Sequence, residues 1–102
     1  MYIATVKVPK QWISLESLIQ EQVEGQSSFA FDSNTTYQLQ GESDAGIRLL
    51  EASIAPDNRK EGFRILGTQV ALYKKSTGSL FVSSVAGVQE GGALLKISAL
   101  EA

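Results

Sequence analysis

The chain contains neither histidine nor cysteine among its 102 residues. Histidine is the side chain whose unperturbed pKa lies nearest neutrality, and both missing types are preferred ligands of transition metals. Their absence excludes thiol nucleophiles, histidine-based acid–base catalysis, disulfides and ordinary zinc sites. The sequence therefore argues against an enzyme, a metal site and a cofactor, and favours a structural or interaction protein.

An excess of positive charge is also missing. Nine basic and eleven acidic residues give a net charge of −2, and the two signs are mixed along the chain. The only adjacent basic pairs, Arg59-Lys60 and Lys74-Lys75, each lie beside a turn. A sequence-independent nucleic-acid binder needs a contiguous positive face, so we do not expect nucleic acid as a partner.

Long apolar runs are absent as well. No stretch approaches the roughly 20 apolar residues that span a bilayer, so no membrane partner is expected. The first ten residues lack a basic segment followed by an apolar run, so we expect no signal peptide. Hydrophobic residues nevertheless make up 43% of the chain and charged residues 20%, which predicts one folded domain over residues 1–102.

Only one helix is indicated. Ser14 can cap it, because a serine hydroxyl accepts a hydrogen bond from the first turn. Apolar residues follow at helical spacing at Leu15, Leu18 and Ile19, and Gly25 is a suitable stop.

The rest of the chain has the two-residue alternation of β-strands separated by turn residues. The absence of helices between the later strands predicts antiparallel sheets, in a β-sandwich or barrel-like domain. Alternation of this kind is found in segments 2–8, 27–32, 35–40, 47–52, 63–66, 69–74, 80–84 and 93–100.

Individual residues refine this outline. Pro9 places the first strand at a sheet edge, since proline cannot donate to a ladder. Apolar residues on both faces of segment 47–52 indicate a central strand. Gly62 is expected at positive φ, and Ser76-Thr77-Gly78-Ser79 is typical of a tight hairpin with Gly78 at positive φ.

The carboxylates could serve a hydrolase only if two of them faced one cleft. The closest pairs are Glu42 with Asp44 and Asp57 with Glu61, and both pairs fall in loops flanked by glycine or proline. Solvated loop carboxylates are the favoured interpretation, because catalytic acids usually occupy apolar clefts.

The aromatic residues fall mostly on alternating strand positions, which favours a place in the core. Tyrosine and tryptophan near loops can instead form an exposed platform for a small ligand or glycan. In that alternative the platform residues would be Trp12, Tyr37 and Tyr73.

Several segments together resemble small β-domain structural proteins encoded among the virion genes of tailed phages. Trp12 opens a Trp-x-x-Leu-Glu pattern, Tyr37 a Tyr-x-Leu-Gln pattern, and Gly78 a Gly-x-Leu-Tyr/Phe-Val/Ala-x-Ser pattern. Phe81 stands where tyrosine is more common in that pattern. The resemblance covers most of the chain from residue 12 to residue 98, through segments 12–19, 36–40, 48–51, 55–56, 78–84 and 94–98.

The resemblance implies a non-enzymatic structural protein of a phage particle or prophage, located in the virion or in the bacterial cytoplasm during assembly. It implies self-assembly into a homo-oligomer, with a trimer as one form, and docking to other virion proteins. Segment 1–24 is then a candidate assembly arm. The candidate interface residues are Tyr2, Ile3, Val6, Val8, Trp12, Leu15, Leu18 and Ile19.

Overall fold

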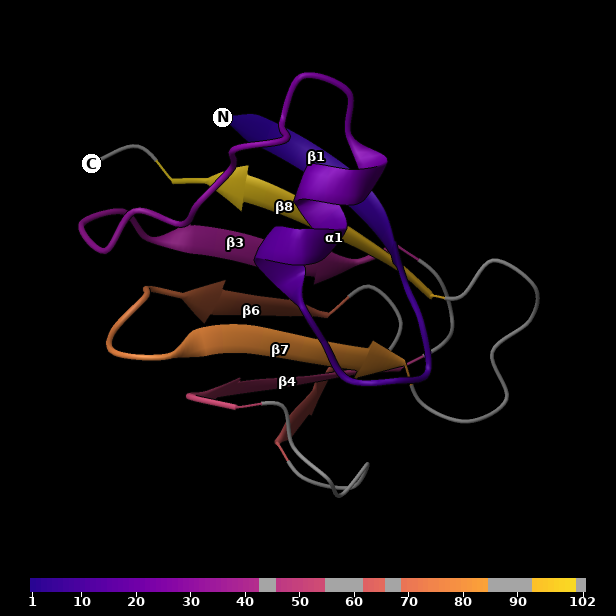
Figure 1. The fold of residues 1–102 in the computed structure, drawn as a ribbon. Helices are drawn as coiled ribbons and strands as arrows, with labels where there is room; N and C mark the ends of the chain where they lie inside the picture. Colours follow the sequence, from indigo (N-terminus) through magenta and orange to yellow (C-terminus); the bar gives the residue numbers. More distant parts are fainter. Residues whose placement is uncertain (43–45, 55–61, 66–68, 85–92, 101–102) are drawn as a thin grey trace.

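The computed structural model describes residues 1–42, 46–54, 62–65, 69–84 and 93–100. Within them the chain forms eight strands and one helix. Figure 1 shows how these elements are arranged. The elements are β1 (Tyr2–Val8), β2 (Ile13–Ser14), α1 (Leu15–Gln22), β3 (Tyr37–Gly41), β4 (Ile47–Ala52), β5 (Phe63–Ile65), β6 (Val70–Tyr73), β7 (Ser79–Ser84) and β8 (Ala93–Ala99).

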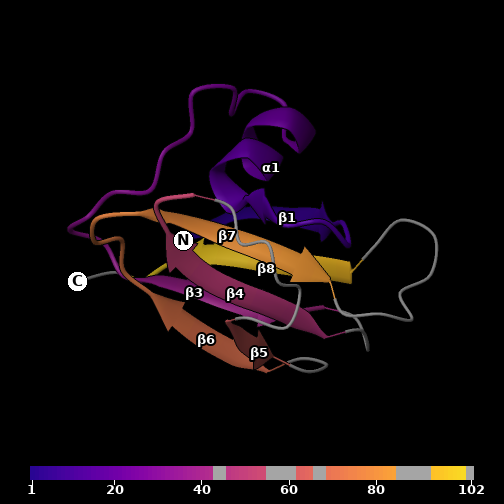
Figure 2. The same cartoon turned by 60° about the horizontal axis from the view of Figure 1, so that its bottom comes forward.

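The strands form two four-stranded sheets, in the orders β1-β8-β3-β6 and β2-β7-β4-β5. All pairs are antiparallel, which confirms the predicted sheet type. The first strand pairs with the eighth, the second with the seventh, the third with the sixth and the fourth with the fifth. This is the order produced when one long hairpin is rolled up, and it defines a jelly roll (Figure 2).

The strands alternate buried and exposed residues, so that the two sheets enclose one core. Leu39, Leu95 and Ile97 from the first sheet face Ile47 and Val82 from the second, and each is at most 1% exposed. Burial of such a side chain contributes about 1.5–3 kcal/mol of transfer free energy. The predicted edge position of β1 and central position of β4 are both confirmed.

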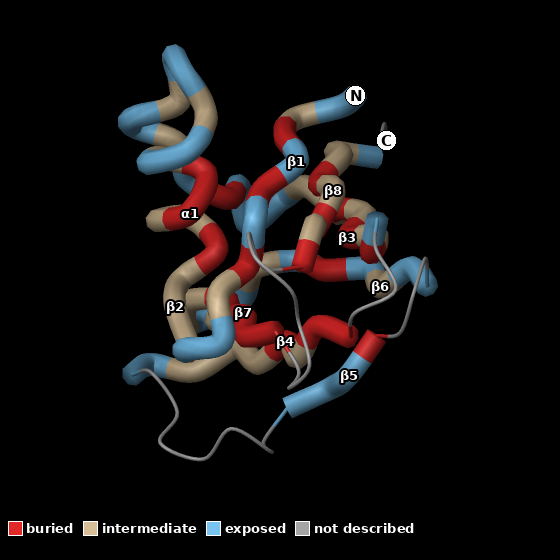
Figure 3. The backbone as a smooth tube through the Cα atoms, turned by 90° about the vertical axis from the view of Figure 1, so that its right-hand side faces the viewer, coloured by how far each residue is buried: buried red, intermediate tan, exposed pale blue. Residues whose placement is uncertain are grey.

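Helix α1 closes one side of the sandwich. The Ser14 hydroxyl accepts a hydrogen bond from the Ser17 amide, as the predicted cap requires, and the helix ends three residues before Gly25. Its apolar face packs against β1, β2 and β7. In Figure 3 the helix lies beside β1 and β2, on the opposite side of the molecule from β5 and β6.

Segment 27–32 is not a strand, contrary to the alternation of Phe29 and Phe31. Phe31 is 4% exposed and makes edge-to-face contacts with Phe29, Tyr37 and Tyr73, at ring-centroid distances of 5.1, 4.8 and 5.2 Å. The backbone is tied to the helix instead of to a sheet, because the Phe31 amide donates to the Glu16 carboxylate at 2.7 Å. Packing against aromatic residues distant in sequence has therefore overridden the local pattern.

The predicted hairpin at Ser76–Ser79 is also wrong. Strands β6 and β7 belong to different sheets, where β6 pairs with β3 and β7 pairs with β2 and β4. Gly78 does not adopt a positive φ. It is small for another reason, since a Cβ atom there would lie 2.7 Å from the Ala52 carbonyl oxygen. The connection between β6 and β7 therefore crosses from one sheet to the other. The positive φ predicted at Gly62 is confirmed, at +85°.

Candidate functional site

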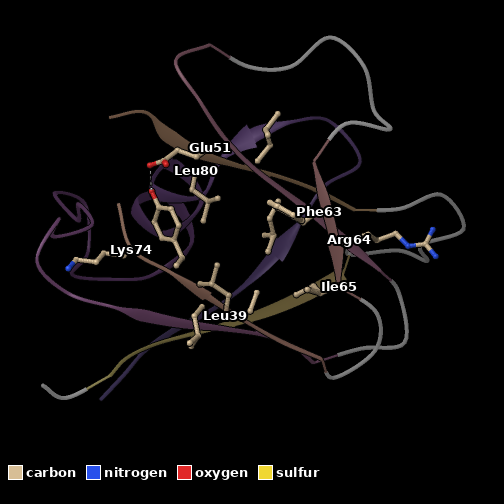
Figure 4. A pocket seen from close by; sticks show the side chains of 12 residues that line it. Leu39, Glu51, Phe63, Arg64, Ile65, Lys74 and Leu80 are labelled. Atoms are coloured by element: carbon tan, nitrogen blue, oxygen red, sulfur yellow. Dashed lines mark hydrogen bonds between the residues drawn. The ribbon is translucent and has the colours of Figure 1, made fainter. Parts of the chain in front are cut away.

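Among the described residues, no helix or further strand covers the side of the sandwich opposite α1, which we call the open side. There β6 ends one sheet and β5 ends the other, and a cleft of about 550 Å³ lies between them. Apolar side chains from both sheets line this β5–β6 cleft, as seen in Figure 4. They include Leu39, Leu49, Phe63, Ile65, Ala71 and Leu80.

Phe63 is the most exposed of these residues, at 78%. It pairs with Leu49 across β4 and β5, and so belongs to the row of residues that faces between the sheets. A residue in that row is normally covered by the opposite sheet, but β6 is the last strand there. On β6, Leu72 is 67% exposed and Val70 is 47% exposed. The open side therefore presents large apolar residues on two neighbouring edges.

Glu51 closes one end of the cleft and links the two sheets. Its carboxylate accepts hydrogen bonds from the Tyr73 hydroxyl at 3.2 Å, the Ser76 amide at 2.9 Å and the Ser76 hydroxyl at 3.0 Å. The hydrogen bond from the Ser76 amide contributes most to lowering the pKa of Glu51. Burial and the neighbouring Glu51 charge raise the pKa of the Tyr73 hydroxyl, which therefore stays protonated and donates.

The other charged residues at the cleft do not converge on it. In Figure 4 the side chains of Arg64 and Lys74 extend away from the hollow in different directions. Among the described residues, no group of three or more acidic side chains is placed to hold a metal ion. Of the predicted carboxylate pairs, Glu42 is exposed, whereas Asp44, Asp57 and Glu61 lie outside the described residues.

The predicted interface residues divide into two groups. Tyr2 is exposed, and Ile3 and Trp12 are half-buried. The others lie in the core of their own chain, where each is at most 3% exposed, so they are not surface residues of this fold: Val6, Val8, Leu15, Leu18 and Ile19. Segment 1–24 is likewise built into the sandwich, since β1 pairs with β8 and α1 covers the sheets.

The predicted platform does not exist as an exposed surface. Tyr37 is 4% exposed and Tyr73 is 9% exposed, and both pack against Phe31. The Tyr37 hydroxyl accepts a hydrogen bond from the Asp32 amide at 2.8 Å. These tyrosines are core residues whose hydroxyl groups are satisfied. Of the three predicted platform residues, Tyr73 lines the cleft, whereas Trp12 and Tyr37 do not.

Sequence reasoning missed Phe63, Val70 and Leu72 as candidate site residues. The alternation in β6 separated Val70 and Leu72 from Ala71 and Tyr73, but it did not reveal which pair faced the core. Lysine does not decide between the two faces, because Lys74 continues the face of Val70 and Leu72 and Lys75 continues the face of Ala71 and Tyr73.

We find no protein-family model, no curated protein and no solved structure that matches this chain. Within the described residues, no helix has the length and apolar character needed to cross a membrane.

Proposed function

We propose that this chain is a non-enzymatic structural protein of a phage particle or prophage, which acts by self-assembly and by docking to other virion proteins. The observation that carries the proposal is the open side of the sandwich. Strands β5 and β6 expose Phe63, Val70 and Leu72 there, whereas α1 covers the opposite side. Exposed apolar sheet edges are typical sites of strand pairing between chains.

The exposed sheet edges, and not the fold class, support this proposal. Jelly rolls occur in viral capsid proteins, but also in lectins and cupins, so the architecture does not determine the function. A site for chemistry would need convergent polar groups. At the β5–β6 cleft the polar contacts instead join Glu51 to Tyr73 and Ser76, which strengthens the fold.

The test is the solution mass measured by light scattering after size exclusion, over a range of concentrations. We expect assemblies heavier than the 11.0 kDa chain. The variant Phe63→Ser should reduce assembly, because it removes the most exposed aromatic residue of the open side.

Ile54→Ser is the matched control. Ile54 is 77% exposed, almost as much as Phe63, but it does not line the cleft. This variant should assemble like the parent chain. A monomer at every concentration, or equal loss of assembly in both variants, would contradict self-assembly through the open side.

The cleft also favours a second candidate function, the binding of a small apolar ligand. Its volume of about 550 Å³ falls in the range of ligand pockets, and its lining is mainly aliphatic. This candidate replaces the glycan platform, since Tyr37 and Tyr73 are buried.

The ligand candidate is tested with an anilinonaphthalene dye, which fluoresces in apolar sites. Ala71 lines the cleft and is half-buried, so Ala71→Phe should fill the space and abolish saturable dye binding. Saturable binding that is unchanged in Ala71→Phe would exclude the cleft as the dye site.

A further inference from the structure

Three of the four sheet edges carry features that discourage pairing with another chain. Strand β2 has only two residues and packs against α1. Strand β5 has three residues with the charged Arg64 at its centre. Strand β1 contains an irregularity in its pairing between Tyr2 and Ala4, and exposes Lys7. Short strands, bulges and charges are the usual means by which edges are kept from pairing.

The backbone at the β1 edge is capped as well. Lys7 directs its peptide groups away from β8, because the paired residues alternate along an antiparallel ladder. The Gln22 side chain binds both of these groups. Its Oε1 accepts from the Lys7 amide at 2.8 Å, and its Nε2 donates to the Lys7 carbonyl at 2.8 Å. The side-chain amide of Gln22 thus forms the two hydrogen bonds that a neighbouring strand would otherwise form with Lys7.

Strand β6, the other edge of the same sheet, is one residue longer than β5 and has neither the charge of β5 nor the pairing irregularity of β1. Its four residues are Val70, Ala71, Leu72 and Tyr73, with no charge and no proline. The Gly41 amide donates to the Gln69 carbonyl at 3.2 Å, so by alternation Val70 and Leu72 direct their peptide groups away from β3. Among the described residues, no side chain caps these outward groups as Gln22 caps Lys7.

The β6 sequence is also complementary to itself in antiparallel orientation. If Ala71 lies opposite Ala71 of a second copy, Val70 lies opposite Leu72 of that copy, and Leu72 lies opposite its Val70. The outward peptide groups of Val70 and Leu72 then exchange hydrogen bonds, and their exposed side chains pack together on the same face. In this register Lys74 does not lie opposite the same lysine of the second copy.

We propose that two copies of this chain pair through β6 in antiparallel orientation, with Ala71 on the two-fold axis, to form one continuous eight-stranded sheet. This inference rests on the proposed function, because it specifies the partner and the geometry of self-assembly. The contact is two-fold symmetric, so it produces a dimer. Any assembly with a higher or odd copy number needs a further contact.

The absence of cysteine from the chain allows a direct test of the register. In an antiparallel pair of identical strands only one residue meets itself. We therefore expect Ala71→Cys to form a disulfide-linked dimer under mild oxidation, because facing Cα atoms in such a pair are about 4.5 Å apart, within disulfide range. Val70→Cys and Leu72→Cys should not cross-link when each is oxidised alone.

A mixture of the Val70→Cys and Leu72→Cys chains is the positive control for this register, and should yield a cross-linked heterodimer. A second comparison uses charge. Leu72→Lys should weaken the dimer about tenfold or more, because the change occurs twice in the symmetric contact. Gln38→Lys places the same charge opposite Leu72 on the same face, one strand away from the edge, and should leave the dimer intact.

The outcomes separate this inference from the proposed function. A monomer at all concentrations would contradict both. Self-assembly that persists in Leu72→Lys, or that yields only trimers, would overturn pairing through β6 and leave self-assembly standing. Cross-linking of Val70→Cys or Leu72→Cys alone, without cross-linking of Ala71→Cys, would overturn the register.

Discussion

The carboxylate of Glu51 is expected to be the main polar link between the two sheets at the open side. It accepts hydrogen bonds from Tyr73 on one sheet and from the amide and hydroxyl of Ser76 in the connection to β7. Glu51→Gln keeps the shape of the side chain but removes the charge and one acceptor oxygen. The variant therefore tests the hydrogen bonds with little change in packing.

The expected cost follows from the three hydrogen bonds. A hydrogen bond to a charged group is worth about 1.5–3 kcal/mol when buried, but Ser76 is exposed and the Tyr73 contact is long. We expect the free energy of unfolding to fall by about 1–2 kcal/mol. For a domain of this size that corresponds to a loss of roughly 5–12 °C in Tm, measured by circular dichroism at pH 7.

The pH dependence gives an independent check. The pKa of Glu51 is lowered in the folded state from its ordinary value of 4.5. Its stabilising contribution is therefore complete above pH 4.5 and is lost as the pH falls through the folded-state pKa. The difference in Tm between the parent chain and Glu51→Gln should be largest at pH 7 and should shrink below pH 4.5. Equal Tm values at pH 7, or a difference that does not shrink in acid, would refute the reasoning.

Three further predictions concern stability and the protected edge. Gly62→Ala should lower the free energy of unfolding, measured by urea denaturation, by about 2 kcal/mol or more. Gly62 has a φ of +85°, and an added Cβ atom would lie 2.5 Å from the Leu49 carbonyl oxygen. An unchanged urea midpoint would contradict this prediction. Ile19→Ala should cost about 2–5 kcal/mol in the same assay, because Ile19 is fully buried under the helix; a cost below about 1 kcal/mol would place α1 outside the core. Gln22→Ala should leave the β1 edge uncapped and increase aggregation, measured by light scattering. Aggregation equal to that of the parent chain would mean that the Gln22 side chain does not protect this edge.

Much of the fold was predictable because its signals are local. The hydroxyl of Ser14 indicated where the helix begins, and Pro9 indicated an edge strand. Apolar residues on both faces of segment 47–52 indicated a central strand. Each of these inferences depends on residues within a few positions of one another, and the structure confirms them.

The failures all involve contacts between distant parts of the chain. Phe31 leaves the strand pattern because Tyr37 and Tyr73 offer it an aromatic site, and Tyr73 is more than forty residues away in sequence. Gly78 resembles a hairpin residue, but its turn carries the chain from one sheet to the other. The local residue pattern does not reveal which strands share a sheet.

The candidate site was missed for the same reason. Local alternation identified the two faces of β6, but whether Leu72 or Tyr73 faced the core depended on the aromatic cluster around Phe31. The exposure of Phe63 depends on strand order too, since β6 is the last strand of the opposite sheet in the part of the chain that the structure describes. Predicted interface residues such as Val6 and Ile19 proved to be core residues, because apolar character alone does not distinguish a core from an interface.

The most direct test of the central claim is the solution mass of the parent chain and of Leu72→Lys, measured side by side by light scattering across a range of concentrations. We predict that the parent chain approaches twice the 11.0 kDa chain mass as concentration rises, and that Leu72→Lys requires about tenfold more protein to do so. A parent chain that remains at 11.0 kDa throughout would contradict the account.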